Sequence, residues 1–248
     1  PYLETVIVVF MFLAGVNFAL HYRFLLGAWG VYRRDPEFRF YVAIWFGASL
    51  WIFAHRASVE PVGLGAAIRE SLFQVTSIMT TTGFVTADYA GWPVGARMAL
   101  LLLMFFGGCA GSTAGGIKHI RMYIGLKQVL RQIQLALLPQ AVVRVKVGRE
   151  VVDNAAVDNV VGFILLFAVV FVVASLLMAY FSPDLDTAFS AVAATLCNVG
   201  PGLGAVGPAH TYAEIPAAGK GILIVCMWLG RLELFTIVTM LLPRFWRR

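Results

Sequence analysis

The stretch MFFGGCAGSTAGGIKHIR, residues 104–121, decides how the rest of the chain is interpreted. The residues that precede its glycines, MALLLLMFF (98–106), are typical of the middle of a membrane helix. Five glycines then follow within ten residues, and each lowers helix stability by about 1 kcal/mol relative to alanine. The sequence therefore predicts a membrane helix that breaks between residues 107 and 116.

Two other interpretations of these glycines fit less well. Gly111 and Gly116 have the spacing of a phosphate-binding loop, but Ile117 stands where that motif needs lysine, and no strand precedes it. Gly111 and Gly115 form a GxxxG helix-packing motif, which needs fewer small residues than are present. Unwound backbone is tolerated at membrane depth where it lines a water-filled path, and this is the interpretation that we favour.

The composition predicts an integral membrane protein. Of the 248 residues, 60% are hydrophobic and 13% are charged, whereas soluble domains carry about 25% charged residues. The net charge of +6 comes from basic residues near the ends of apolar stretches, which fits membrane topology and not nucleic-acid binding. Cys109, Cys197 and Cys226 have neither metal-ligand nor disulfide-framework spacing. Neither an initiator methionine nor a signal peptide is recognisable, so we expect a piece of a longer protein.

Hydropathy and charge together predict a topology. Five stretches are apolar enough to cross a bilayer, at about 4–26, 38–56, 95–130, 157–181 and 218–243. Lysine and arginine concentrate after the first stretch, after the third and at the C-terminus. Because cytoplasmic loops are enriched in these residues, we expect the N-terminus outside and the C-terminus in the cytoplasm.

Two shorter apolar segments, 66–84 and 185–204, lie between spans on the outer side. Counting either of them as a further span would reverse the alternation of basic loops, so we expect each to enter the membrane and return on the same side. Residues 38–130 and 157–245 then form an internal repeat in which Gly83 aligns with Gly200. The predicted fold class is an all-α membrane protein of repeated helix–re-entrant pore helix–helix units, with five membrane-spanning helices and two pore loops.

Each re-entrant segment ends in residues that favour extended backbone, TTTGF (80–84) and CNVGPG (197–202). Extended backbone directs carbonyl oxygens toward an axis, where a ring of them replaces the hydration shell of a monovalent cation. The negative ends of the two short helices would point toward the same cation. The alternative, an ordinary outer loop with a glycine turn, fits poorly with two such segments in matching repeat positions. Four segments are needed to close a ring, and this chain supplies two.

The final span contains two ionisable residues, Arg231 and Glu233. Residues two apart on a helix do not face each other, so an internal ion pair does not explain them. Arg231 also lies too far from either end of the span for its side chain to reach the membrane surface. An ionisable group at membrane depth therefore predicts a functional role for Arg231.

Four motifs resemble the Trk/Ktr/HKT superfamily of potassium transporters, and within it the bacterial TrkH type. They are SIMTTTGF (77–84), GGCAGSTAGGIKHIR (107–121), AVAATLCNVGPGLG (191–204) and GRLELFT (230–236), and FMFLAGVNFALHYR (10–23) adds to the resemblance. The resemblance implies four pore units around one path. Residues 1–36 would be the last helix of an otherwise absent second unit with a cytoplasmic loop, 37–149 the third unit with a broken second helix and a basic cytoplasmic segment, and 150–248 the fourth.

The resemblance also implies roles for individual residues. The potassium-binding filter would consist of Thr81, Thr82, Gly83, Phe84, Asn198, Val199, Gly200 and Pro201, with the ion at Thr82, Gly83, Val199 and Gly200. Gly83 and Gly200 match glycines that the family links to preference for potassium over sodium. A gate below the filter would consist of Gly107, Gly108, Gly111, Ser112, Thr113, Gly115 and Gly116. Arg231 would act as an electrostatic barrier in the pore.

These features predict potassium uptake across a bacterial inner membrane, with potassium as the transported ligand and no required cofactor. The resemblance implies a homodimer in membrane lipid with a cytosolic nucleotide-binding regulatory subunit of the TrkA type. The basic segment 118–149 is a candidate docking region, and its residues 139–150 alternate as in a short strand or hairpin.

We consider three alternatives to potassium uptake, of which the sequence leaves the first two open. One is a sodium-permeable or sodium-coupled relative, and another is a non-conducting fragment, because two pore units are missing. The third, an intramembrane enzyme, would need a nucleophile and base or paired carboxylates at membrane depth. Glu233 is the one clear mid-span carboxylate, so we expect no enzyme.

Overall fold

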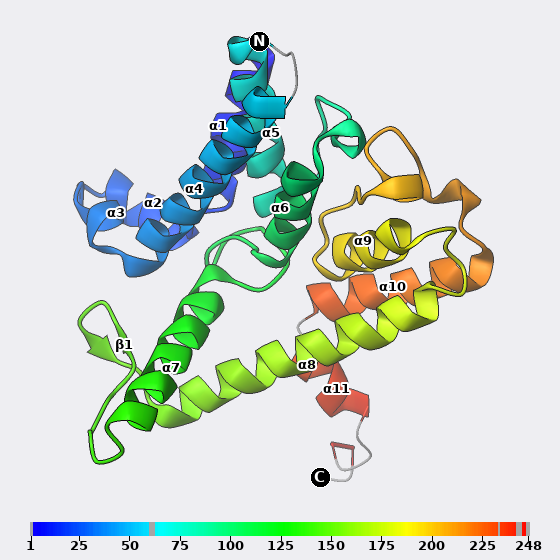
Figure 1. The fold of residues 1–248 in the computed structure, drawn as a ribbon. Coiled ribbons are helices and arrows are strands. Elements are labelled where there is room, and N and C mark those ends of the chain that lie inside the picture. The colour runs from blue at the N-terminus through cyan, green and yellow to red at the C-terminus, as the bar shows by residue number, and fades with distance from the viewer. Residues whose placement is uncertain (1, 60–62, 233, 242–244, 247–248) are drawn as a thin grey trace.

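The computed structural model of the chain describes residues 2–59, 63–232, 234–241 and 245–246. These residues form a mostly helical protein, as expected (Figure 1). The elements in chain order are α1 (Tyr2–Ala14), α2 (Phe18–Leu25), α3 (Val31–Arg34), α4 (Pro36–Val59), α5 (Leu64–Met79), η1 (Tyr89–Gly91), α6 (Val94–Phe105), α7 (His119–Leu137), β1 (Lys146–Val147), β2 (Glu150–Val151), α8 (Asn154–Met178), α9 (Leu185–Leu196), η2 (Gly204–Val206), η3 (Tyr212–Glu214), α10 (Ala217–Arg231) and α11 (Leu234–Leu241).

The two short helices α5 and α9 lie at the centre of the packing. Residues 73–79 of α5 are all buried, and so are residues 187–196 of α9 except Phe189. A helix that is buried on every side belongs to a core. α5 packs mainly against α4, α1 and α6, and α9 against α10 and α8. The order long helix, short buried helix, helix therefore occurs twice, in α4–α5–α6 and in α8–α9–α10.

The predicted span over residues 4–26 is not one straight helix. Two helices, α1 and α2, cover this range and are bent by 99° relative to each other. The chain turns because Asn17 begins α2, with its side-chain oxygen accepting from the amide of Ala19 at 2.8 Å. Gly15 lies against the Tyr41 hydroxyl, where a Cβ would come within 2.6 Å. The bend thus allows a close approach that a straight helix with a larger side chain would prevent.

Unbroken spans are fewer than the five expected. Among the described residues, α4 and α8 are long and apolar enough to cross a membrane, and the bent pair α1 and α2 reaches that length together. The predicted span 95–130 is divided between α6 and α7, which confirms the break in the glycine-rich stretch. The predicted span 218–243 is not one uninterrupted helix either, because α10 ends at Arg231 and Leu232 lies in a bend. Glu233 lies outside the described residues.

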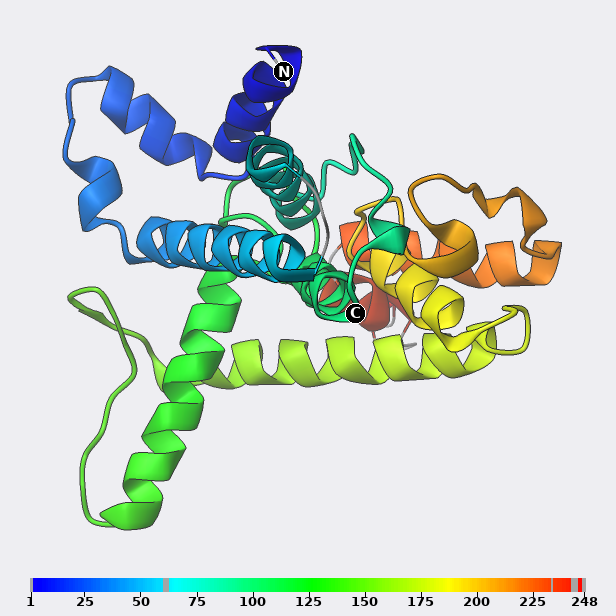
Figure 2. The same cartoon turned by 45° about the horizontal axis from the view of Figure 1, so that its top comes forward.

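The predicted hairpin after α7 is present. β1 and β2 pair antiparallel, with Lys146 opposite Val151 and Val147 opposite Glu150. Gly148 makes the turn with a φ of +61°, a conformation that glycine adopts without a Cβ clash. The C-terminal part of α7 projects away from α5 (Figures 1 and 2). The hairpin turn lies beside the start of α4, since a Cβ on Gly148 would come within 3.4 Å of the Pro36 ring.

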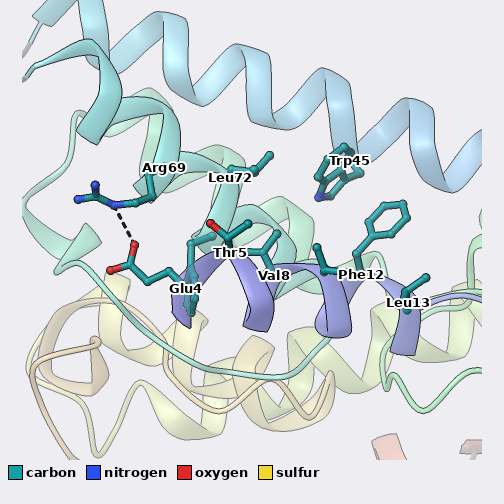
Figure 3. A pocket seen from close by; sticks show the side chains of 10 residues that line it. Glu4, Thr5, Val8, Phe12, Leu13, Trp45, Arg69 and Leu72 are labelled. Carbon is teal, nitrogen blue, oxygen red and sulfur yellow. Dashed lines mark ion pairs between the residues drawn. The ribbon is translucent and has the colours of Figure 1, made fainter. Parts of the chain in front are cut away.

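An apolar cavity of about 290 Å³ lies between α1, α4 and α5, lined by Val8, Phe12, Trp45 and Leu72 among others. Figure 3 shows an ion pair at one end of this cavity, formed by Glu4 of α1 and Arg69 of α5. The Arg69 Nε atom lies 2.8 Å from the Glu4 carboxylate. The pair connects the first helix of the chain to the first short buried helix.

A more deeply buried ion pair, between Arg56 and Glu70, joins the C-terminal end of α4 to α5. The Arg56 side chain is 3% exposed, donates to Glu70 at 3.0 Å and lies 3.9 Å above the Trp92 ring. Removing a buried charge leaves its partner unpaired, so we expect Arg56→Ala to cost about 2 to 4 kcal/mol of stability. Thermal unfolding of the detergent-solubilised protein measures this loss. Arg69→Ala is the matched control, and an equal melting temperature for both variants would contradict the account.

Candidate functional site

Two turns of matching backbone follow the short buried helices. The first turn (residues 80–84) leaves α5, and the second turn (residues 197–201) leaves α9. Thr81 and Asn198 have φ values of 53° and 57° and are the two described non-glycine residues with positive φ. Gly83 and Gly200, two residues further on, have φ values of 78° and 117°. Left-handed backbone in a residue other than glycine is uncommon and marks a position that the surrounding structure enforces.

The same hydrogen bonds fold both turns back onto their helices. In the first turn, the amides of Thr82 and Gly83 donate to the carbonyl of Ser77, at 2.9 and 3.4 Å. In the second turn, the amides of Val199 and Gly200 donate to the carbonyl of Ala194, at 2.8 and 3.4 Å. Because these amides point back toward the preceding helices, the carbonyl groups of both turns point away from those helices. No described residue donates a hydrogen bond to the carbonyl oxygens of Thr81, Thr82, Gly83, Asn198 or Val199.

The carbonyl groups of Phe84 and Gly200, near the ends of the two turns, do accept hydrogen bonds. Ser77 Oγ donates to the Phe84 carbonyl at 2.6 Å, and the Tyr212 hydroxyl donates to the Gly200 carbonyl at 2.7 Å. Burial raises the pKa of the Tyr212 hydroxyl, which keeps it protonated as a donor. Phe84 is 56% exposed. The Gly200 carbonyl is thus shared with a protein donor, unlike the carbonyls of Gly83 and Val199.

The structure brings the two turns into direct contact. A Cβ built on Gly83 would overlap the Val199 carbonyl oxygen and come within 3.2 Å of the Pro201 ring. A Cβ on Gly200 would meet nothing within 4 Å among the described residues. Gly83 is therefore glycine for two reasons, its positive φ and the close approach of Val199, whereas Gly200 is required by φ alone.

The break between α6 and α7, residues 106–118, forms a folded segment that we call the break loop. Its ends pair with each other, because the amide of Gly107 donates to the carbonyl of Ile117 at 2.9 Å and the amide of Ile117 to that of Phe105 at 3.1 Å. Gly111 and Gly116 have φ values of 70° and 64°. Oxygens of Gly15 and Ala14, at the α1–α2 bend, accept from Cys109 and Thr113. The Phe18 amide donates to Gly111 O at 3.1 Å.

The break loop reaches both the first turn and α10. The amide of Gly115 donates to the Thr81 hydroxyl at 2.7 Å, and Arg231 Nη1 donates to the carbonyl of Thr113 at 3.2 Å. Asn198, the counterpart of Thr81, donates to the carbonyl of Met227 in α10 at 3.3 Å. Thr81 therefore ties the first turn to the break loop, and Asn198 ties the second turn to α10.

A cavity of about 210 Å³ lies between the break loop and α10. Three cationic side chains line it, those of Lys118, Arg121 and Arg231, and no described acidic residue does. Lys118 Nζ donates to the carbonyl of Ala114 inside the loop, and the Arg121 guanidinium lies 4.1 Å above the Phe163 ring. Positive charges that share a cavity repel an entering cation.

The structure therefore places the predicted residues in one region. Thr81, Thr82, Gly83 and Phe84 lie in the first turn, and Asn198, Val199, Gly200 and Pro201 in the second. Gly107, Gly108, Gly111, Ser112, Thr113, Gly115 and Gly116 lie in the break loop, which Arg231 contacts. Sequence reasoning missed Tyr212 and Glu37, whose carboxylate accepts from two amides of the loop region. An acidic residue at the start of an apolar helix carries no signal that distinguishes this role.

Gly115 lies where an added methyl group should disturb both the loop and the second turn. Its Cβ would come within 2.5 Å of the Cys197 carbonyl oxygen and 3.1 Å of the Asn198 Cβ. We expect Gly115→Ala to displace the break loop and change rubidium flux by about tenfold or more, as overpacking costs about 1–3 kcal/mol. Gly47→Ala, at a position with nothing within 4 Å, is the control. Wild-type flux in both variants would contradict a tightly fitted loop.

The chain is similar to known transport proteins. Residues 1–247 match the family TrkH, described as "Cation transport protein". The chain is 38% identical over its whole length to the "Trk system potassium uptake protein TrkH" of Escherichia coli K12, covering 51% of that protein. It is 40% identical to the protein of that name from Vibrio parahaemolyticus, covering 99% of this chain and 51% of the relative.

A solved structure is similar as well. The crystal structure of the potassium transporter TrkH from Vibrio parahaemolyticus superposes with a TM-score of 0.91 at 40% identity, over 98% of this chain and 53% of that one. The chain thus spans about half the length of the relatives that it matches. A family of transport proteins excludes the enzyme considered above, and with the apolar helices α4 and α8 it makes this a membrane protein. The chain belongs to the TrkH family of cation transport proteins.

Proposed function

We propose that this chain forms half of a pore for potassium uptake, with the two turns as part of its selectivity filter. The observation that carries the proposal is the pair of matching turns, whose central carbonyls receive no hydrogen bond from any described residue. Such carbonyls replace the hydration shell of a monovalent cation. The C-terminal ends of α5 and α9 add a negative dipole potential at the same place. The names of the relatives specify potassium.

The filter ligands would be the carbonyl groups of Thr82, Gly83 and Val199, which receive no hydrogen bond from a described residue, and that of Gly200, which also accepts from the Tyr212 hydroxyl. Two further pore units, supplied outside this chain, would complete the ring. The repeat of α4–α5–α6 and α8–α9–α10 supports the assignment of 37–149 and 150–248 as two pore units and of 1–36 as the end of another. Five membrane crossings and two pore loops remain our prediction for this arrangement.

The break loop would be the gate and Arg231 the barrier beneath the filter. In the structure the loop contacts the first turn through Thr81 and α10 through Arg231. A cation that leaves the filter would meet the loop and the positive cavity beyond it. Opening therefore requires the loop to lose its contacts with Thr81 and Arg231 and to move aside.

We place the chain in the bacterial inner membrane as a homodimer that binds a cytosolic nucleotide-binding subunit of the TrkA type. The N-terminus would lie outside and the C-terminus in the cytoplasm. The segment 118–149 supports a docking role, because the C-terminal part of α7 projects from the helices around the turns (Figure 2). Leu126, Val129, Leu130, Ile133 and Leu137 of α7 are exposed, which is typical of a contact surface.

Growth of a potassium-uptake-deficient bacterium on low potassium tests the function. We expect the natural gene that encodes this chain to restore growth, and sodium in large excess to leave that growth unchanged. Failure to restore growth with the protein present in the membrane would overturn the proposal. Rescue that sodium abolishes would instead support the sodium-permeable alternative.

A further inference from the structure

Glu37 lies near the break loop but belongs to neither the filter nor the barrier. It is the second residue of α4, and it is 7% exposed. Its Oε1 atom accepts from the amide of Ala110 at 2.7 Å and from the amide of Ile120 at 3.0 Å. A carboxylate that is removed from water is costly unless it receives such hydrogen bonds. One oxygen atom therefore joins two amides that are ten residues apart in the chain.

The two amides lie on either side of the part of the break loop that contacts the filter. Thr113 and Gly115, which bond to Arg231 and Thr81, lie between Ala110 and Ile120 in the chain. Glu37 consequently holds the segment between Ala110 and Ile120 at its two ends, while Thr81 and Arg231 hold its middle. These attachments use different elements, since Glu37 belongs to α4.

The α7 helix lacks its own means of stabilising its N-terminus. Lys118, the residue before its first turn, makes no side-chain capping bond, and the first turn contains no acidic residue. A negative charge at a helix N-terminus is favourable because it complements the free amides and the helix dipole. Glu37 provides this charge from α4. Asp35 fixes the start of α4 by accepting from the amide of Phe38 at 2.7 Å.

We propose that Glu37 is a positioning residue that clamps the break loop at Ala110 and the start of α7 at Ile120 through one carboxylate oxygen, and thereby limits how readily the loop leaves the pore. The proposal rests on the gating role proposed above. The charge of the carboxylate is essential, because hydrogen bonds to an ionised acceptor are about twice as strong as neutral ones. Glutamine has nearly the same shape but is neutral, so it retains the geometry with weaker bonds.

Hydrogen–deuterium exchange of the whole transporter in detergent tests the clamp. We expect Glu37→Gln to accelerate exchange in peptides covering 106–120 by about threefold and Glu37→Ala by about tenfold, as two charge-assisted bonds weaken or are lost. Peptides from residues 40–59 of α4 should exchange as in the wild type, which a general loss of structure would not allow. Glu70→Gln, in α5 beside the C-terminal end of α4, is the control and should leave exchange at 106–120 unchanged.

Rubidium flux in the same variants separates the clamp from the gate. Faster exchange together with higher flux supports both. Faster exchange with wild-type flux supports the clamp and overturns the gating role of the loop. Unchanged exchange at 106–120 in Glu37→Gln overturns the clamp whatever the flux, and this holds even where Glu37→Ala does not fold.

Discussion

Replacing Gly83 by alanine is expected to lower rubidium flux by about tenfold or more and to reduce the preference for potassium over sodium. A left-handed residue with a Cβ costs about 1–2 kcal/mol, and at Gly83 the φ is +78°. The added methyl group would also overlap the Val199 carbonyl oxygen. Because Val199 is a proposed ion ligand, the strain falls on the filter itself. Flux into proteoliposomes, with potassium or sodium as competitor, measures both effects.

Gly221→Ala is the matched control for Gly83→Ala. Gly221 lies in α10 and has nothing within 4 Å of a built Cβ, so the same change in chain entropy occurs there without a clash. We expect wild-type flux and selectivity from this variant. Equal selectivity in Gly83→Ala and Gly221→Ala would contradict the placement of an ion site at the contact between the two turns.

Removing the charge of Arg231 is expected to raise rubidium flux by about tenfold in both Arg231→Ala and Arg231→Gln. A unit charge about 8 Å from a cation at an effective dielectric of about 20 opposes it by about 2 kcal/mol, which corresponds to a rate factor of about tenfold to thirtyfold. Lys118 and Arg121 line the same cavity, so some repulsion should remain. Stopped-flow or tracer flux at equal protein density measures the change.

The two Arg231 variants separate charge from hydrogen bonding. Glutamine retains a donor for the Thr113 carbonyl, which Arg231 contacts at 3.2 Å, whereas alanine retains neither donor nor charge. High flux in both variants identifies the charge as the barrier. High flux in alanine alone would show that the hydrogen bond holds the gate closed. Arg33→Ala, an exposed arginine in α3, is the control, and wild-type flux in all three variants would contradict any barrier role.

Much of the arrangement around the two turns follows from local sequence chemistry. TTTGF and CNVGPG contain the glycines that positive φ requires, and the structure has Gly83 and Gly200 in that conformation. The concentration of glycine at 107–116 predicted a broken helix, and α6 indeed ends at Phe105 while α7 begins at His119. These features are local, since backbone conformation depends mainly on the residues that adopt it.

The missed features depend on contacts between distant segments. The bend at Gly15 follows from packing against Tyr41 and the break loop, whereas hydropathy alone favoured one straight helix. Glu37 bonds to amides that lie more than seventy residues further along the chain. A backbone amide has no side-chain signature, so no sequence pattern could connect it to a particular carboxylate. The close fit of Gly115 against the second turn is likewise a tertiary contact.

The most direct test of the central claim is unidirectional rubidium uptake by the product of the natural gene, reconstituted in liposomes, with potassium and sodium as competing ions. If the carbonyl groups of the two turns form part of a potassium filter, potassium should suppress rubidium uptake at concentrations about tenfold or more below those that sodium needs, as a difference of about 1.4 kcal/mol in binding gives that ratio. Uptake no faster than in empty liposomes, or equal suppression by both ions, would contradict it.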